Sequence, residues 1–191
     1  MATIAITGHT AGIGQAFAKR LTADGHTIVG LSKREGNNIR VIPKIVDQIA
    51  PCDMWINNAQ AGYAQSELLF KVCERWKDAG PRVIWSIGTV MSRSQRFPTV
   101  KGLNDFELAE YRNQKRALID AVETAKHLVP TVKHCLIHPG AVATQPQWPN
   151  GADVNAWANY VVDSWYESRL NNLLLNEISL SYYAKETALE P

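Results

Sequence analysis

Cysteine is scarce in this sequence: only Cys52, Cys73 and Cys135 occur, and they lie far apart. An odd number of widely spaced cysteines predicts neither a disulfide framework nor a metal site, and it is typical of a reducing cytoplasm. Long apolar runs are missing too, so we expect no membrane span. The first residues, MATIAITG, enter a strand-like pattern without a preceding basic segment, so no signal peptide is predicted.

Neither sign of charge is in excess, since 20 Lys and Arg residues face 18 Asp and Glu residues for a net charge of +2. This balance gives no electrostatic reason to expect nucleic acid or a membrane as a partner. The 191 residues, 46% of them hydrophobic, are enough for one domain with a sizeable core. No repeat or linker interrupts the chain, so we expect a single domain over 1–191.

Short apolar runs alternate with amphipathic stretches along the whole sequence. The runs that predict strands are 3–7, 26–31, 53–57, 82–88, 133–138 and 177–183. The stretches that predict helices are 13–23, 40–50, 64–77, 106–128 and 154–171. Continuously apolar strands are expected where helices cover both faces of a parallel sheet. The pattern therefore predicts an α/β fold, a Rossmann-like doubly wound parallel sheet, whose ligands bind beyond the carboxyl ends of the strands.

A glycine-rich loop, ITGHTAGIG at 6–14, follows the first predicted strand and opens a helix. Glycines there let the backbone approach a pyrophosphate, which the free N–H groups of the helix N-terminus would bind. The spacing is G-x-x-x-G-x-G, and taken alone the loop could equally be a simple strand-to-helix turn. The candidate cofactor-binding residues in this loop are Gly8, Thr10, Gly12, Ile13 and Gly14.

The second predicted strand ends in a hydroxyl and two cations, Ser32, Lys33 and Arg34. An acid near this point would bind the ribose 2′-hydroxyl of NAD, whereas cations would attract the 2′-phosphate of NADP. We therefore favour NADP(H) over NAD(H), although Glu35 weakens the preference. The alternative is a solvated basic turn.

Four motifs, in this order along 3–144, resemble those of the short-chain dehydrogenase/reductase (SDR) family. They are Thr7-Gly8-x-x-x-Gly12-Ile13-Gly14, Asn57-Asn58-Ala59, Tyr111-x-x-x-Lys115 and His138-Pro139-Gly140-x-x-x-Thr144. Gln60 stands where the second motif usually has glycine. The resemblance implies a nicotinamide cofactor, and it adds Asn38, Asn58, Ala59, Pro139, Gly140 and Thr144 to the cofactor-binding candidates.

Tyr111 and Lys115 are four residues apart in a predicted helix and therefore share one face. A free tyrosine, with a pKa of about 10, exchanges protons poorly near neutral pH. We expect the neighbouring ammonium to lower that pKa, so that Tyr111 acts as general acid or base during hydride transfer. The resemblance implies that Lys115 also holds the cofactor ribose. The alternative is that Tyr111 packs and Lys115 is solvated.

The family also uses a hydroxyl that hydrogen-bonds the substrate oxygen. Alignment of the strand end SIGT with the family pattern places Thr89 there, with Ser86 close by and Ser92 and Ser94 as alternatives. The catalytic residues we predict are therefore Thr89, Tyr111 and Lys115.

The sequence departs from the family pattern in several segments. The stretch 36–53 is shortened and must hold a vestigial third strand and a helix. The helix that supplies an asparagine to the proton relay is missing, and Gln65 is a candidate replacement. The C-terminal section 145–191 is reduced.

A longer loop, 89–106, separates Thr89 from the catalytic helix and would overhang the active site. Its cations, Arg93, Arg96 and Lys101, could bind an anionic substrate or could simply be solvated. The substrate is expected to be a small molecule.

By resemblance, we expect a homo-oligomer, dimer or tetramer, associated through helix 106–128. On that helix Leu118, Val122 and Ala125 would suit a mixed core and interface face. The aromatic stripe of helix 154–171 favours a core or subunit interface over a substrate wall; it comprises Trp157, Tyr160, Val161, Ser164 and Trp165.

The sequence thus favours a small NADP(H)-dependent oxidoreductase that interconverts a carbonyl and an alcohol. Two alternatives stay open. Threonine at the hydroxyl position suggests a nucleotide-sugar epimerase or dehydratase, which recycles its cofactor internally. The missing relay helix suggests a non-catalytic NADP-binding sensor or scaffold.

Overall fold

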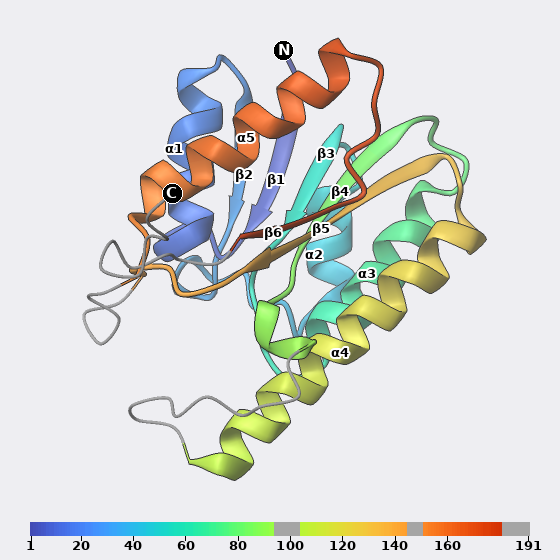
Figure 1. Ribbon diagram of the computed structural model, residues 1–191. Coiled ribbons are helices and arrows are strands. Elements are labelled where there is room, and N and C mark those ends of the chain that lie inside the picture. The colour runs from blue at the N-terminus through green and yellow to red at the C-terminus, as the bar shows by residue number, and fades with distance from the viewer. Residues whose placement is uncertain (94–103, 145–150, 181–191) are drawn as a thin grey trace, which may run out of the picture.

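The computed structural model describes residues 1–93, 104–144 and 151–180 as a parallel sheet between two layers of helices (Figure 1). The strands are β1 (Thr3–Thr7), β2 (Thr27–Leu31), β3 (Met54–Asn57), β4 (Arg82–Ile87), β5 (Val132–Pro139) and β6 (Glu177–Leu180). The α-helices are α1 (Gly12–Ala23), α2 (Ile42–Ile49), α3 (Ala64–Trp76), α4 (Asp105–Leu128) and α5 (Val154–Leu170). Two short 3-10 helices, η1 (Lys33–Glu35) and η2 (Val90–Ser92), follow β2 and β4.

The six strands are all parallel and lie in the order β2-β1-β3-β4-β5-β6. The chain moves outward from β1 to β2 and then crosses back to β3 on the other side of β1. The strand order therefore reverses between β1 and β3, and in such sheets ligands bind beyond the carboxyl ends of the strands at this point. The predicted α/β fold with a doubly wound parallel sheet is confirmed.

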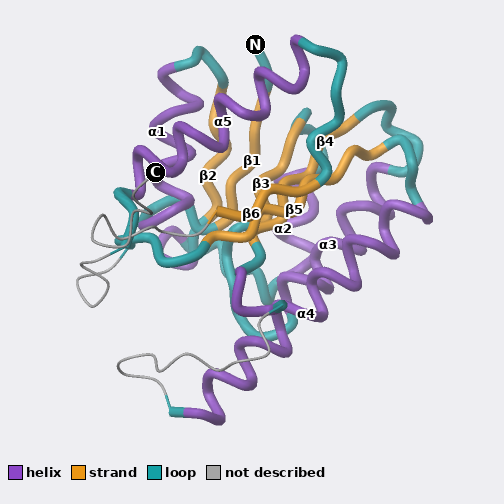
Figure 2. The backbone as a smooth tube through the Cα atoms, in the orientation of Figure 1, coloured by secondary structure: helices purple, strands orange, loops and turns teal. Residues whose placement is uncertain are grey.

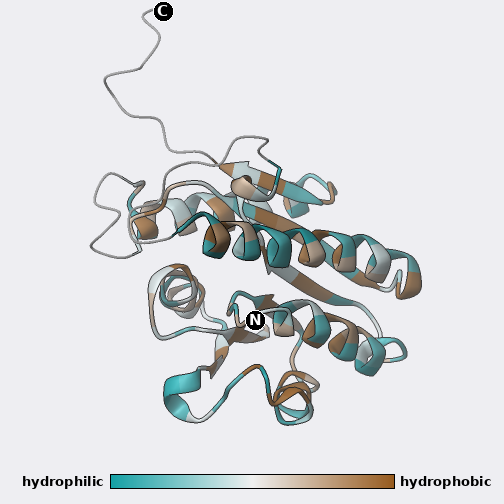
Figure 3. Ribbon diagram, turned by 90° about the horizontal axis from the view of Figure 1, so that it is seen from below, coloured by the Kyte–Doolittle hydropathy of each residue, from teal (hydrophilic) through white to brown (hydrophobic). Residues whose placement is uncertain are grey.

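Helices α1 and α5 cover one face of the sheet, and α2, α3 and α4 cover the other (Figure 1). Successive strand residues supply opposite faces: Trp55 packs with the three-helix layer, whereas Trp85 packs with α1 and α5. Phe17 of α1 lies 5.5 Å from Trp85 and 5.8 Å from Trp157 of α5, measured between ring centroids. Figure 3 shows hydrophobic residues (brown) recurring along the helices between hydrophilic ones (teal).

The long helix α4 begins at a capping box. The Asn104 side chain accepts a hydrogen bond from the Glu107 amide, and the Glu107 side chain accepts one from the Asn104 amide. This arrangement satisfies two backbone N–H groups that a helix start leaves without a partner. It fixes the start of the helix that carries Tyr111 and Lys115.

The prediction of a vestigial strand in 36–53 is wrong. Between β2 and β3 the chain forms only η1, turns and α2. Gly36 adopts a left-handed conformation with φ of 80°, and a turn closes by a bond of 2.9 Å from the Val41 amide to the Asn38 carbonyl. Pro43 then opens α2. These turns prevent an extended segment, so β2 forms the edge of the sheet.

Leu118, Val122 and Ala125 were expected to serve core and interface together, but each is 0% exposed within the single chain. They pack against the sheet and α3, so they are not available to a partner subunit. In the aromatic stripe of α5, Trp157 and Val161 are core residues, whereas Tyr160 is 58% exposed. The homo-oligomer thus stays a prediction.

The three cysteines are buried and none is in a disulfide. In the described residues no helix has the length and apolar character needed to cross a membrane. Of the predicted last strand, 177–183, the part up to Leu180 is confirmed, and 181–183 lie outside the described residues.

Candidate active site

Most of the predicted site residues lie at the carboxyl ends of the strands, in the loops that lead from a strand to the next helix (Figure 2). Gly8 and Thr10 follow β1, Ser32 to Arg34 follow β2, Asn58 and Ala59 follow β3, and Thr89 follows β4. Pro139 ends β5, and Gly140 and Thr144 follow it. Motifs that are far apart in the sequence are thereby brought to a single edge, as a parallel sheet requires.

The glycine loop passes very close to its own helix. A Cβ atom added to Gly14 would lie 2.3 Å from the Gly8 carbonyl oxygen, so only glycine fits there. The N-cap residue of α1, Ala11, makes no side-chain cap, and no acidic residue lies in the first turn. The free N–H groups of this helix N-terminus suit an anion. A glycine cradle beside an uncapped helix therefore fits the pyrophosphate of a dinucleotide.

Asn58 connects this loop to β3. Its side-chain Nδ2 donates hydrogen bonds to the Thr7 carbonyl at 3.0 Å and to the Gly8 carbonyl at 3.3 Å. The Thr7 hydroxyl in turn accepts from the backbone amides of Asn58 and Ala59, at 3.0 and 3.2 Å. Asn58 and Ala59 thus fix the shape of the glycine loop.

On the other side of the glycine loop lies Thr144, because a Cβ atom on Gly12 would be 3.3 Å from the Thr144 Cβ. Gly12 itself has a φ of 55°, which favours glycine. Gly140 is held by a bond of 2.8 Å from its amide to the Leu180 carbonyl. The first and last motifs of the sequence therefore meet at the N-terminus of α1.

The segment after β2 contains a polar cluster that the sequence did not indicate. Ser32, 3% exposed, donates its hydroxyl proton to Glu35 Oε2 at 3.0 Å. The same oxygen lies 3.4 Å from Nε2 of His9 in the glycine loop. Lys33 and Arg34 are exposed on η1. The Ser32 hydroxyl is thus engaged by an acid, while the two cations face outward.

Asn38 lies in the turn before α2, where its side-chain oxygen accepts a hydrogen bond of 3.1 Å from the Arg40 amide. The adjacent Ile39 is 4% exposed and packs in the core. The place of Asn38 beside an adenine stays a prediction.

Tyr111 and Thr89 come together from α4 and the end of β4. A hydrogen bond between their side chains lowers the pKa of Tyr111, but burial raises it more, so the pKa lies above its ordinary value of 10.0. The lowered pKa that we expected from the neighbouring ammonium is therefore wrong for the free chain. Burial disfavours the phenolate, and Lys115, also buried, tends to lose its own charge.

Lys115 is 3% exposed and lies beneath Tyr111, its Nζ 5.8 Å from the centre of the tyrosine ring. Burial lowers the pKa of Lys115 from 10.5 to about 7. Nζ donates to Gln65 Oε1 at 2.9 Å and to the Ile87 carbonyl at 2.8 Å. A neutral amine has two N–H groups, so these two acceptors suit the uncharged form without leaving a proton unpaired.

Gln65, a buried residue in the first turn of α3, is held rigidly. Its Nε2 donates to the Asn57 carbonyl at 2.7 Å and to the Ile87 carbonyl at 3.3 Å. Asn57 Nδ2 donates to the Gln65 carbonyl at 3.2 Å. The hydrogen bond from Lys115 supports the hypothesis that Gln65 replaces the missing asparagine. A role of Gln65 in a proton relay stays a prediction.

Of the other candidate hydroxyls, Ser92 has a clear partner. Ser92 donates its hydroxyl proton to the Thr89 carbonyl at 2.6 Å, and so it supports Thr89. Ser86 is 1% exposed within β4. The alternative Ser94 lies outside the described residues.

Arg93, one of the cations that could bind an anionic substrate or be solvated, is instead paired within the chain. It donates hydrogen bonds to both carboxylate oxygens of Glu177 on β6. Arg96 and Lys101 lie outside the described residues, as does most of the loop 89–106 and the first part of 145–191.

His138 is a residue whose surroundings sequence reasoning missed. It is 0% exposed at the end of β5, with one ring nitrogen facing Thr89 and the other facing Glu177. The available signal was a histidine directly before Pro139, at a strand end otherwise occupied by apolar side chains.

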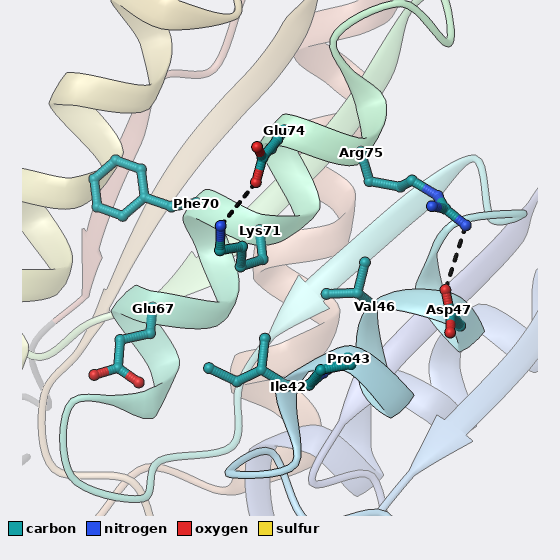
Figure 4. Close-up of a pocket in the computed structure, with 9 residues that line it drawn as sticks. All are labelled: Ile42, Pro43, Val46, Asp47, Glu67, Phe70, Lys71, Glu74 and Arg75. Atoms are coloured by element: carbon teal, nitrogen blue, oxygen red, sulfur yellow. Dashed lines mark hydrogen bonds and ion pairs between the residues drawn. The ribbon is translucent and has the colours of Figure 1, made fainter.

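Two hollows elsewhere in the described residues contain none of the predicted site residues. One lies between α2 and α3, where Ile42, Val46 and Phe70 are bordered by the ion pairs Lys71–Glu74 and Arg75–Asp47 (Figure 4). The other lies toward the amino ends of β3, β4 and β5, beside Trp165 and Tyr166 of α5. The candidate site rests instead on the motifs gathered at the carboxyl ends of the strands.

No protein-family model matches the sequence, and a comparison with curated protein sequences finds no match. Solved structures, in contrast, resemble this chain over nearly its whole length. An oxidoreductase of the short-chain dehydrogenase/reductase family from Burkholderia thailandensis has a TM-score of 0.73 at 16% identity, covering 94% of this chain and 90% of that one.

Two further similar structures contain a bound cofactor. The 3-alpha-hydroxysteroid dehydrogenase from a Pseudomonas species, complexed with NADH, has a TM-score of 0.68 at 16% identity and covers 94% of this chain and 95% of that one. A short-chain dehydrogenase from Sphingobium yanoikuyae, in complex with NADPH, has a TM-score of 0.66 at 16% identity. The match covers 93% of this chain and 87% of that one. This chain therefore has the fold of the short-chain dehydrogenases/reductases.

Proposed function

We propose that this chain is an NADP(H)-dependent oxidoreductase of the short-chain dehydrogenase/reductase type, which transfers a hydride between nicotinamide and a small carbonyl or alcohol. The observation that supports this best is the meeting of Thr89, Tyr111 and Lys115 at the edge where the glycine loop lies. The Tyr111-x-x-x-Lys115 pair on α4 and Thr89 at the end of β4, each with a proton to give or hold, come together there. The solved structures complexed with NADH and NADPH have the same overall fold.

The glycine loop and the N-terminus of α1 would hold the pyrophosphate, and Asn58 and Thr144 would border it. The bound nicotinamide supplies the hydride. Tyr111 gives a proton to the substrate oxygen during reduction and takes one during oxidation. The Thr89 hydroxyl hydrogen-bonds that oxygen. Lys115, with a pKa of about 7, exchanges protons near neutral pH and lies close enough to influence the charge on Tyr111.

Preference for NADP(H) depends on Lys33 and Arg34, which are exposed beyond Ser32. Guanidinium and ammonium groups attract a 2′-phosphate. Glu35 opposes this attraction, because its carboxylate lies beside Ser32 and His9. We propose that the two cations outweigh the single acid.

The test is a panel of small aldehydes and ketones, some of them anionic, incubated with NADPH while the absorbance of the reduced cofactor is followed. Tyr111→Phe should lower kcat by about a hundredfold or more and leave NADPH binding unchanged. Tyr160→Phe, an exposed tyrosine on α5, is the matched control and should keep wild-type turnover. Wild-type turnover by Tyr111→Phe would contradict the proposed role of Tyr111.

The same assay separates the two alternatives. An epimerase or dehydratase would convert a nucleotide sugar without net loss of reduced cofactor. A sensor or scaffold would bind NADPH, show no turnover on any substrate, and lose its biological effect only through variants of the cofactor loop.

A further inference from the structure

A buried histidine lies directly behind the hydroxyl that faces Tyr111. His138 Nδ1 is 3.3 Å from the Thr89 carbonyl oxygen, and its Nε2 is 3.6 Å from Glu177 Oε1. The side chain of His138 is 0% exposed. The chemistry proposed above assigns it no task.

The local fold makes room for this ring. A Cβ atom on Gly88 would lie 2.7 Å from His138 Nδ1, so glycine at this position allows the imidazole to reach Thr89. In the pairing of β5 with β6, His138 lies opposite Ser179 and Leu136 lies opposite Glu177. His138 and Leu136 share one face of the sheet, and the Glu177 carboxylate reaches the imidazole diagonally from that face.

The neighbours of the ring determine where its proton lies. The Thr89 carbonyl can only accept a hydrogen bond, so Nδ1 is assigned the proton. Burial lowers the pKa of His138, while Glu177 and the bond to Thr89 oppose that shift, and Arg93 and Lys115 reinforce it. A neutral imidazole with its proton on Nδ1 follows. The charge of Glu177, which faces Nε2, is compensated by Arg93.

We propose that His138 is a positioning residue for Thr89: its Nδ1–H holds the Thr89 carbonyl and thereby orients the Thr89 hydroxyl toward Tyr111. The inference rests on the proposed role of Thr89 in the oxidoreductase site. Thr89 is then held from two sides, by His138 on β5 and by Ser92, whose hydroxyl and amide bond the same carbonyl at 2.6 and 3.2 Å. Glu177 and Arg93 close the outer side of the imidazole.

Three substitutions of His138 separate the hydrogen bond from simple packing. His138→Asn places an amide nitrogen near the position of Nδ1 and can still donate to the Thr89 carbonyl. His138→Gln places it near Nε2, toward Glu177, and His138→Leu fills the space without a donor. Glu177→Gln is the matched control, because it changes only the outer side of the ring.

The first readout requires no turnover: the titration of Tyr111 in the free protein, followed by NMR with tyrosine labelled at Cζ. The Thr89 bond lowers the pKa of Tyr111, so Gln and Leu at position 138 should raise that pKa toward its value in Thr89→Val. His138→Asn and Glu177→Gln should leave it unchanged. A Tyr111 titration in His138→Leu that equals the wild type would overturn the proposal.

The second readout is kcat and KM with NADPH and the best substrate of the panel. The Gln and Leu variants should lose about tenfold in kcat, with the affinity for NADPH unchanged, because a small displacement of a reacting group is costly. His138→Asn should keep most of the wild-type kcat. Equal losses in the Asn and Leu variants would show that packing alone matters, and this would overturn the proposal.

A measurement on the wild type covers the case in which the variants do not fold. The ¹⁵N chemical shifts of the His138 ring should show the proton on Nδ1, and a proton on Nε2 instead would contradict the proposal. If the wild type binds NADPH but turns nothing over, the proposed function fails, whereas the ring tautomer and the Tyr111 titration still test the position of Thr89.

Discussion

The amine of Lys115 lies 2.9 Å from the side-chain oxygen of Gln65, and both residues are almost completely buried. Gln65 is fixed in turn by the backbone at Asn57 and Ile87. The lysine of the proposed catalytic pair is therefore held by the first turn of α3, the neighbouring helix on the same face of the sheet.

Gln65→Leu should destabilise the chain, because it removes the acceptor of Lys115 and leaves the Asn57 carbonyl without its donor. We expect the free energy of unfolding to fall by about 2 kcal/mol, measured by urea denaturation. Glu67→Asp, exposed on the same first turn, is the control and should change it by about 0.5 kcal/mol or less. Equal stability of Gln65→Leu and wild type would mean that this contact contributes nothing.

Lys115 should make the stability of the cofactor-free chain depend on pH above neutrality. Its pKa is about 7 in the folded chain and 10.5 in the unfolded one, so the unfolded state binds more protons between these values. Stability due to Lys115 is therefore lost as pH falls through this window and gained as pH rises. Between pH 7 and 8.5, the gain should be about 1.5 kcal/mol larger in wild type than in Lys115→Met. Parallel pH dependences in urea denaturation would contradict the lowered pKa.

His134 should weaken the fold in acid. Both of its ring nitrogens lack a hydrogen-bond partner within the described residues, and burial lowers its pKa from 6.5 to about 4. The unfolded state binds the proton first as pH falls from 6.5 to 4, so stability is lost over this range. From pH 7 to pH 5 the wild type should lose about 1–2 kcal/mol more than His134→Leu. Thermal or urea denaturation at the two pH values measures this difference.

Glu35 should reduce the preference for NADP(H). Glu35→Gln removes a carboxylate from the cluster with Ser32 and His9. We expect NADPH to bind about threefold to tenfold tighter, while the affinity for NADH changes little. Arg34→Ala should act in the opposite direction and weaken the binding of NADPH by about tenfold. Titrations of both variants with both cofactors test this. If NADH binding changes by the same factor as NADPH binding, neither side chain distinguishes the 2′-phosphate.

Most of the fold was predictable from the sequence, because strands buried on both faces are apolar throughout and amphipathic helices lie between them. The missing strand was not predictable, because the turn geometry at Gly36 and Val41 decides it and the apolar Ile39 suits either structure. The predicted catalytic residues meet in the structure because their motifs follow strand ends or occupy one helix face.

Electrostatics and pairing were harder to foresee. The sign of the Tyr111 pKa shift depends on how deeply Tyr111 and Lys115 are both buried, which spacing along a helix does not reveal. Arg93 and His138 share one acidic partner, Glu177. This residue is distant in the sequence and reaches them only through the pairing of β5 and β6.

Direct titration of the purified chain with NADPH and NADH, followed by tryptophan fluorescence, tests the central claim that a nicotinamide cofactor binds at the carboxyl edge. We predict that NADPH binds about tenfold tighter than NADH. Thr144→Trp, which puts an indole beside Gly12, should abolish binding, whereas Thr22→Trp on the exposed end of α1 should not. Tighter binding of NADH would reverse the cofactor preference alone. Absence of binding to either cofactor would contradict the account.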